Sequence, residues 1–261
     1  MEYQTIIVEK NNAVGYLTLN RPERYNSLTI QMSEEIVDAL KQWKDDDQVK
    51  VIVIQAAGKA FCTGQEISPE LFSHMPIDLG EVIEKYTYPI IELVVNTPKV
   101  FICAVNGVAA GAGASLALLC DMTIAAKSAG FTQIFSKIGL VPDCGATWYL
   151  PRMIGFAKAK ALMLTAEKIT ADEAERLGML YKVVEDEQLQ QEVITLAEHM
   201  ATQATLSYGL IKQALLASLQ NDLTTQLALE RDLQRQAGQS EDFMEAARAF
   251  LMKDTPNFKG R

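Results

Sequence analysis

A glycine-rich turn in the middle of the chain, set between an apolar strand and a helix of small residues, constrains the fold more than any other feature. Residues 100–105 are continuously apolar and predict a buried strand, and residues 112–119 predict a helix that leads into another strand at 122–126. The turn between the first two reads GVAAGAG (107–113). A strand, a turn and a helix in this order are typical of an α/β protein with parallel strands.

The N-terminal region shows the same alternation. Residues 4–10 and 13–19 predict a hairpin that turns at Asn11 and Asn12. Apolar side chains at helical spacing over 32–43 predict a helix, and residues 49–56 predict a buried strand. This β-β-α-β order is not accompanied by a strict sequence repeat, so it predicts one α/β core rather than a repeat protein.

The last part of the chain is helical almost throughout. Four helices are predicted, at 188–202, 206–219, 223–237 and 241–252. Because the composition changes near residue 200, we expect an α/β core over residues 1–200 and a helical unit over residues 201–261. The apolar face of that unit can pack either on the core or on another subunit.

Composition excludes several classes of partner. The chain has 261 residues and a net charge of -9, and this acidic balance argues against binding to nucleic acid. Its 4 cysteines form no CxxC pair and its 2 histidines stand apart, so we expect no metal site and a reducing compartment. No apolar run reaches the ~20 residues of a membrane span. We therefore expect a cytoplasmic protein with no membrane contact.

Two glycine turns are candidates for ligand binding. The turn at 107–113 could present free amides and a helix N-terminus to an anion, although close packing of a helix on a strand also needs small residues. A second turn, AGKAFCTGQEI (57–67), follows the strand at 49–56. If the two preceding strands are parallel neighbours, both turns lie at strand C-termini, where open α/β sheets bind ligands. Two backbone amides could then converge.

One carboxylate, Asp143, lies in a turn just ahead of another helical segment, within IGLVPDCGATW (138–148). This position makes Asp143 the leading candidate for a catalytic acid or base. The alternative is that Asp143 is a turn or N-cap residue. Neither Cys144 nor Ser115 has a histidine placed in sequence to activate it as a nucleophile.

Several motifs together resemble those of the crotonase, or enoyl-CoA hydratase/isomerase, superfamily. They are LTLNRP, AFCTGQEI, AVNGVAAGAG and LLCD, at residues 17–22, 60–67, 104–113 and 118–121. The resemblance extends over nearly the whole chain. It implies an α/β fold with a crotonase-like ββα spiral core and an α-helical C-terminal trimerisation region. It also implies a homotrimer, or a hexamer made of two trimers, that binds an acyl-CoA substrate.

The same resemblance implies roles for individual residues. The backbone amides of Gln65 and Ala112 would form an oxyanion hole for the thioester oxygen. Coenzyme A is part of the substrate, so no separate cofactor is implied. Besides Gln65 and Ala112, the residues implied to contact the substrate are Arg24, Ala60, Ile67, Ser115, Phe135, Phe258 and Lys259.

The chain departs from the hydratases of this family, which use two glutamates to add water. Ser115 and Phe135 stand at those positions, so water addition should be weak or absent. Asp143 stands where some family isomerases and the aryl-CoA dehalogenases carry a functional aspartate. The segments most similar to ring-1,2-epoxyphenylacetyl-CoA isomerases of bacterial phenylacetate catabolism are 131–145, 210–214 and 226–231.

We therefore expect an acyl-CoA isomerase with an oxyanion hole and one aspartate base. The expected reaction is isomerisation of ring-1,2-epoxyphenylacetyl-CoA to the oxepin-CoA, a shift of an enoyl-CoA double bond from β,γ to α,β, or both. An apolar wall around Asp143 would raise its pKa and make it a stronger base. The alternatives are an enoyl-CoA hydratase, an aryl-CoA dehalogenase-like hydrolase and a non-catalytic interaction module.

Overall fold

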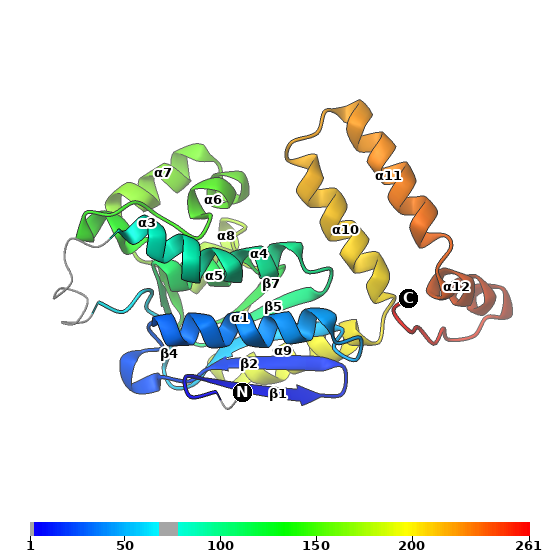
Figure 1. Cartoon of the computed structure of the whole chain (residues 1–261), viewed down its shortest axis with the longest axis horizontal. Helices are drawn as coiled ribbons and strands as arrows, with labels where there is room; N and C mark the ends of the chain where they lie inside the picture. Colours follow the sequence, from blue (N-terminus) through cyan, green and yellow to red (C-terminus); the bar gives the residue numbers. More distant parts are fainter. Residues whose placement is uncertain (1–2, 68–77) are drawn as a thin grey trace.

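Two β-sheets form the centre of the molecule in a computed structural model that describes residues 3–67 and 78–261 (Figure 1). The larger sheet has six strands in the order β1-β2-β3-β5-β7-β10. These strands are β1 (Ile6–Asn11), β2 (Val14–Leu19), β3 (Val51–Ala56), β5 (Val100–Val105), β7 (Met122–Ala126) and β10 (Lys182–Val184). Strands β1 and β2 form the predicted antiparallel hairpin, and the pairs that follow are parallel.

A second, smaller sheet of four strands was not foreseen from the sequence. Its order is β4-β6-β8-β9, with β9 antiparallel to β8, and its strands are β4 (Ala60–Cys62), β6 (Val108–Ala110), β8 (Gly130–Thr132) and β9 (Ile169–Thr170). Each of β4, β6 and β8 follows a strand of the larger sheet after a short turn. The chain therefore winds as repeated ββα turns, and the predicted spiral core is confirmed.

The larger sheet is covered on both faces, which explains why its central strands are continuously apolar. Successive side chains of β3 point to opposite faces. Val51 and Val53 pack with α9 (Leu189–Ala201), whereas Ile52 and Ile54 pack with α1 (Ile30–Asp45) and the rest of the main core.

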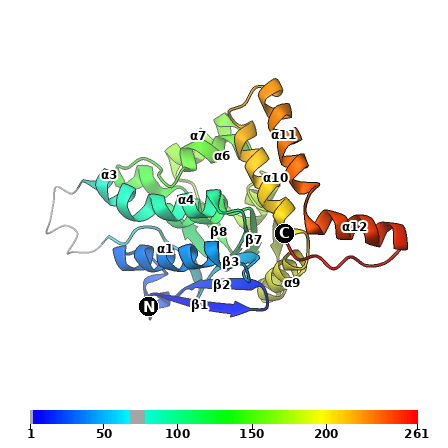
Figure 2. The ribbon, with the colours of Figure 1, turned by 45° about the vertical axis from the view of Figure 1, so that its right-hand side comes forward.

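The remaining helices of the core lie mainly on the α1 side of the larger sheet (Figures 1 and 2). Helix α5 follows β6 directly, and α6 and α7 lie in the chain between β8 and β9 of the smaller sheet. Besides α1 and α9, the helical elements of the core are η1 (Pro22–Arg24), α3 (Leu79–Val82), η2 (Ile83–Thr87), α4 (Tyr88–Asn96), α5 (Ala112–Leu119), η3 (Ile134–Ile138), α6 (Ala146–Ile154), α7 (Phe156–Thr165), α8 (Ala171–Arg176) and η4 (Asp186–Gln188).

Three C-terminal helices extend away from the sheets (Figures 1 and 2). They are α10 (Thr205–Ser218), α11 (Leu223–Ala237) and α12 (Glu241–Met252), close to the predicted bounds. Lys212 on α10 binds Asp121 of the core at 2.7 Å, and Gly209 packs so closely on Pro98 that a Cβ atom would lie 2.7 Å from the proline ring. Within the described parts of the chain, no helix is long and apolar enough to cross a membrane.

Candidate active site

The first candidate amide belongs to Gln65, in the turn that follows β4. Leu28 lies alongside this turn: its N–H donates to Gly64 O at 2.8 Å, and its carbonyl accepts from Glu66 N at 2.9 Å. Because neighbouring peptide groups alternate in direction, the N–H of Gln65 points away from Leu28. Within residues 3–67 and 78–261 this N–H has no backbone acceptor.

The second candidate amide belongs to Ala112, the first residue of α5. Gly111 precedes it with φ +52, and the Gly111 N–H donates to Thr132 O at 3.0 Å. The helical hydrogen bonds begin three residues later, where Ser115 N donates to Gly111 O at 3.0 Å. The Ala112 N–H therefore belongs to the first turn of a helix, whose amides have no partner inside the helix.

The parallel pairing of β4 with β6 brings these two turns together, with Cys62 opposite Ala109. At Gly64, where φ is +92, a Cβ atom would lie 3.0 Å from Ala110 O and 3.4 Å from Ala112 N. Only glycine fits this close approach. Two amides at this edge of the smaller sheet are thus adjacent, as expected if both are to donate to one ligand oxygen.

Asp143 lies in the turn before α6, where Cys144 and Gly145 both have left-handed backbone conformations with φ +53 and +74. Asp143 is half-buried, and its Oδ1 atom is enclosed without a hydrogen-bond partner among the described residues. Burial raises the pKa of Asp143 above its ordinary value, and contacts with the Cys144 thiol and its own backbone amide offset only part of this effect. The direction predicted from the sequence is confirmed.

Tyr149 connects the Asp143 turn to α5, a role that no sequence pattern predicts. The Tyr149 hydroxyl donates to Ser115 O at 2.7 Å, and its ring lies 3.7 Å from where a Cβ of Gly145 would be. Tyr149 is only 7% exposed, so this hydrogen bond is buried. It ties the segment that follows Asp143 to α5, the helix that begins at Ala112.

Ser115 and Phe135, which replace the expected glutamates, are both buried. Ser115 is 0% exposed on α5, one helical turn beyond Ala112. Phe135 is 6% exposed on η3, and its ring lies 3.7 Å from where a Cβ of Gly111 would be. The neighbourhood of the amides thus contains a hydroxyl and a phenyl ring in place of two carboxylates.

The residues predicted to contact coenzyme A lie in different surroundings. Arg24 is exposed at the end of η1, whereas the neighbouring Arg21 is held by an ion pair with Glu66 at 2.7 Å. Ile67, two residues after Gln65, is 55% exposed. Ala60 is buried in β4 at 3% exposure, so its side chain belongs to the core.

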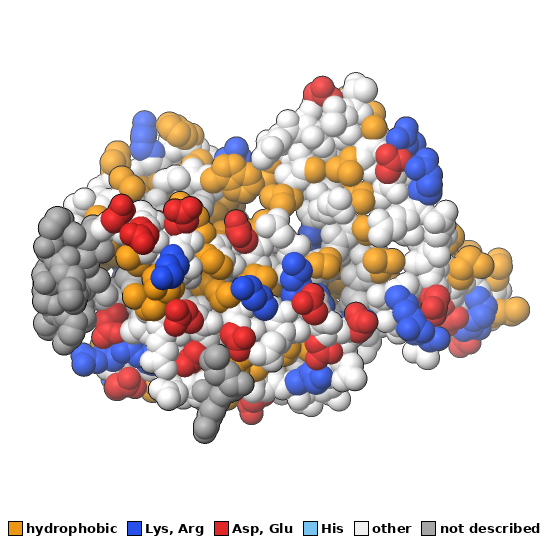
Figure 3. Space-filling model, in the orientation of Figure 1, with side chains coloured by type: hydrophobic (Ala, Val, Ile, Leu, Met, Phe, Trp, Pro, Cys, Tyr) orange, Lys and Arg blue, Asp and Glu red, His pale blue; other side chains and the backbone are white. Residues whose placement is uncertain are grey.

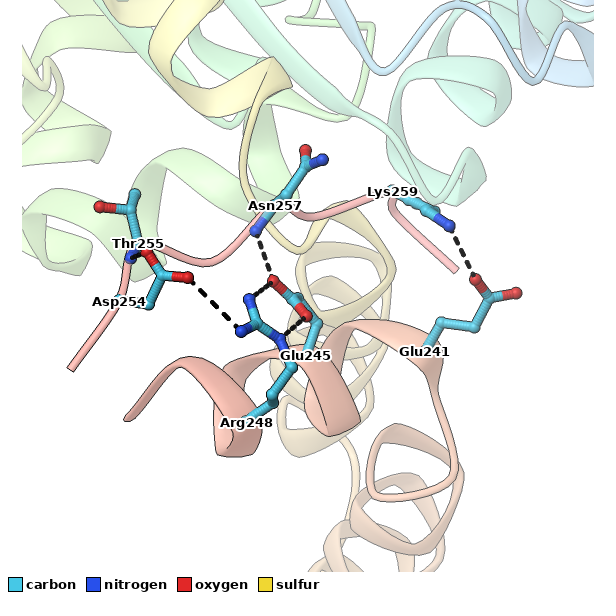
Figure 4. A network of polar contacts seen from close by, with 7 residues as sticks. All are labelled: Glu241, Glu245, Arg248, Asp254, Thr255, Asn257 and Lys259. Atoms are coloured by element: carbon cyan, nitrogen blue, oxygen red, sulfur yellow. Dashed lines mark hydrogen bonds and ion pairs between the residues drawn. The ribbon is translucent and has the colours of Figure 1, made fainter. Parts of the chain in front are cut away.

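Phe258 and Lys259 belong to the C-terminal tail that follows α12, and this tail lies apart from α5 and α6 in Figure 1. Asp242 accepts from the Lys259 N–H at 2.6 Å, and Lys259 Nζ lies 3.7 Å from Glu241 (Figure 4). Phe258 lines a hollow of about 300 Å³ between α10, α11 and α12. Within one chain, the structure does not bring these two residues to the paired amides.

Redox and metal chemistry find little support in the described residues. The four cysteines are buried and not joined in disulfides. Burial raises the pKa of the Cys62 thiol to about 12 and that of Cys144 further still, so neither thiol ionises readily. Across the described part of the chain, no group of three or more His, Cys, Asp or Glu side chains could hold a metal ion.

Comparisons with known proteins support the motif-based resemblance. A family model described as enoyl-CoA hydratase/isomerase matches residues 9–261. The chain is 46% identical over 263 residues to 1,2-epoxyphenylacetyl-CoA isomerase of Escherichia coli (strain K12), with 100% of both chains covered. It is 41% identical over 261 residues to a probable enoyl-CoA hydratase of Rhodobacter capsulatus, again with 100% of both chains covered.

A crystal structure of a putative enoyl-CoA hydratase/isomerase from Mycobacterium abscessus has the same fold. It matches with a TM-score of 0.94 at 32% identity, over 98% of this chain and 100% of the other. The resemblance inferred from the short motifs is therefore confirmed along the whole chain.

Proposed function

The chain belongs to the enoyl-CoA hydratase/isomerase family, and from this premise we propose that it is an acyl-CoA isomerase in which Asp143 moves protons while the amides of Gln65 and Ala112 hold the thioester oxygen. Membership itself supports a crotonase-type activity on acyl-CoA esters. The isomerase reaction and the roles of these three residues are the proposal.

The observation that carries this proposal is the state of Asp143. Its Oδ1 atom is buried and unpartnered among the described residues, and burial raises the pKa of the carboxyl. A carboxylate in such surroundings is a stronger base than one in water and holds its proton long enough to return it. One base that serves two carbon atoms is what an isomerase requires.

The mechanism begins with removal of the α-proton of the thioester by Asp143. The negative charge that develops on the thioester oxygen is stabilised by the N–H groups of Gln65 and Ala112, and one such donor typically contributes ~2.7 to 4 kcal/mol to the transition state. Protonated Asp143 then returns the proton to a different carbon. The two steps together add and remove no atom, so the product has the same mass as the substrate.

Two substrates fit this scheme. With a β,γ-enoyl-CoA, proton return moves the double bond to the α,β position. With ring-1,2-epoxyphenylacetyl-CoA, proton transfer accompanies opening of the strained bicyclic system to the oxepin-CoA. The 46% identity to an enzyme named 1,2-epoxyphenylacetyl-CoA isomerase supports the second reaction and a role in phenylacetate catabolism.

A substrate panel with a mass readout tests the proposal. The enzyme is incubated with β,γ-enoyl-CoA, α,β-enoyl-CoA and ring-1,2-epoxyphenylacetyl-CoA, and products are followed by mass and ultraviolet spectra. We expect conversion of the first or third ester with no change in mass. Products that are only hydrated would overturn the isomerase assignment.

A hydratase is the second candidate because a relative at 41% identity is named as a probable enoyl-CoA hydratase. Against it, Ser115 and Phe135 cannot act as the carboxylate pair that would activate and deliver water. In the substrate panel, a hydratase adds the mass of one water to the α,β-enoyl-CoA.

We also propose that residues 201–261 form a trimerisation unit and that residues 1–200 hold the acyl-CoA site. Large apolar side chains are exposed on α12, where Figure 3 shows them gathered at the end of the molecule; they are Phe243, Met244, Phe250, Leu251 and Met252. Assembly as a homotrimer or a hexamer would cover them and could carry Phe258 and Lys259 to a neighbour's coenzyme A, opposite Arg24 and Ile67.

A further inference from the structure

A few buried polar atoms of this chain have no hydrogen-bond partner among its described residues. They are Gln55 Oε1, Asn106 Oδ1, Ser115 Oγ, both amide atoms of Gln133, and Asp143 Oδ1. Buried polar groups in folded proteins are nearly always paired, so each exception calls for an explanation. Ser115 stands out because it lies on α5, one helical turn from the Ala112 amide.

The position of Ser115 on α5 directs its side chain toward those amides. Residues three apart on a helix share a face, with Cβ atoms about 5–6 Å apart, so Ser115 lies on the same face as Ala112. The Cα–Cβ bond of a helical residue also tilts toward the helix N-terminus, which here is the end that carries the Ala112 N–H.

The backbone groups of Ser115 are both satisfied, which leaves the hydroxyl as the group to explain. Its N–H donates to Gly111 O at 3.0 Å and its carbonyl accepts from Tyr149 at 2.7 Å. Helical hydroxyls usually bond to a carbonyl of the preceding turn. Thr165 and Ser218 of this chain do so, at 2.8 Å and 2.6 Å.

The Ser115 hydroxyl makes no such bond, and it does not bond to Asp143 Oδ1 either. An enclosed hydroxyl without a partner has a free-energy cost relative to a paired one. An acyl group with no oxygen besides its thioester carbonyl would leave the hydroxyl unpaired and that cost in place. An acyl group that carries an oxygen near the α carbon would remove it.

We propose that Ser115 is a specificity-determining residue whose hydroxyl donates a hydrogen bond to an oxygen atom on the acyl group, and so selects oxygenated acyl-CoA esters over their hydrocarbon counterparts. The inference rests on the proposed function, which puts the thioester oxygen at the Ala112 amide. Ser115 lies one helical turn from that amide, and a ring 1,2-epoxide carries its oxygen on the carbon next to the α carbon.

Two unreactive esters of similar size test this selection directly. In 2-methoxyphenylacetyl-CoA and 2-ethylphenylacetyl-CoA, an ether oxygen replaces a methylene group, and the ether oxygen can only accept a hydrogen bond. Dissociation constants are measured by calorimetry for the wild-type protein and for Ser115→Ala. We expect the wild type to bind the methoxy ester about tenfold more tightly, and the ratio to fall to near one in Ser115→Ala.

Two further variants keep the test sharp. Ser207→Ala removes a helical hydroxyl on α10 that already bonds to Ala204 O at 2.7 Å, and it should keep the wild-type ratio. Ser115→Cys retains a weaker donor of similar size and should give an intermediate ratio. Thermal melting of each variant verifies that it is folded.

Equal affinities of the wild type for the two esters would overturn the proposal. So would an equal loss of both affinities in Ser115→Ala, because Ser115 would then act on the thioester or on a bound water. If neither these esters nor phenylacetyl-CoA binds, the proposed function falls as well. If the wild type prefers the methoxy ester while the substrate panel shows no isomerisation, the proposed function alone falls.

Discussion

Two carboxylates in different regions of the molecule are both withdrawn from solvent and yet have opposite properties. Glu35, on α1, is 5% exposed and accepts hydrogen bonds from Thr5 Oγ1 at 2.6 Å, Thr5 N at 2.8 Å and Gln31 Nε2 at 2.9 Å. Asp143, in the turn before α6, has an enclosed Oδ1 atom with no partner among the described residues.

The pKa values of the two groups move in opposite directions. Burial alone raises the pKa of Glu35, but the hydrogen bonds from Thr5, Gln4 and Gln31 outweigh it, so the pKa lies below its ordinary value. At Asp143 burial prevails and the pKa rises. The number of hydrogen-bond donors around each carboxylate, rather than its burial, therefore distinguishes the two. Glu35 holds two segments together, whereas Asp143 stays available for a ligand.

The largest expected effect is on catalysis. Asp143→Asn keeps the shape of the side chain but removes the base, so kcat should fall by about 10²- to 10⁴-fold, a typical contribution of general acid–base catalysis. Isomerase assays with the substrate panel measure this loss, and calorimetry verifies that acyl-CoA still binds. Glu35→Gln is the matched control and should retain kcat while folded. Turnover at the wild-type rate in Asp143→Asn would mean that Asp143, like Glu35, is not the catalytic base.

The next effect is on stability and concerns the other carboxylate. The amide in Glu35→Gln accepts fewer hydrogen bonds than the carboxylate, because its NH2 group directs N–H bonds toward some of the surrounding donors. The free energy of unfolding should decrease by about 3 kcal/mol, because buried donors lose a charged partner. Urea unfolding measures this change. A loss below about 0.5 kcal/mol would mean that the hydrogen bonds of Glu35 do not hold β1 to α1.

Elements with a local signal were predictable from the sequence. The bounds of β5, α5 and β7 follow from a continuous apolar run, a glycine turn and a second apolar run, and all three agree with the structure. The pattern TADE at 170–173 is typical of a capping box, and the structure contains half of one. Thr170 Oγ1 accepts from Glu173 N at 3.2 Å, but the Glu173 carboxylate binds Arg176 at 2.7 Å instead of turning back.

Features set by tertiary contact were not predictable. Strands β4, β6, β8 and β9 have two or three residues each, too few for a periodic pattern, and they exist because the spiral places them side by side. The hydrogen bond from the Tyr149 hydroxyl to Ser115 O joins residues 34 apart in the sequence, and no local sequence pattern predicts it. The candidate site was therefore found through its turns and its single carboxylate, while the groups that fix Asp143 in place came only from the fold.

The smallest effect, and the one that tests the comparison most directly, is the pH dependence of stability. The pKa of Glu35 is lowered, so its contribution is present above the ordinary glutamate pKa and is lost as pH falls through the folded value. The pKa of Asp143 is raised, so wild-type stability decreases relative to Asp143→Asn as pH rises through the folded value.

At neutral pH, Glu35→Gln should therefore melt below the wild type and Asp143→Asn slightly above it. The Asp143→Asn difference should shrink as pH falls toward about 4, near the reference carboxyl pKa values, whereas the Glu35→Gln difference should shrink only as pH falls below about 4, because the folded pKa of Glu35 is lowered. Melting temperatures of the three proteins across this range provide the measurement. An Asp143→Asn protein that melts below the wild type at neutral pH would mean that the Asp143 carboxylate is stabilised in the fold, as Glu35 is, and is not held as a strong base.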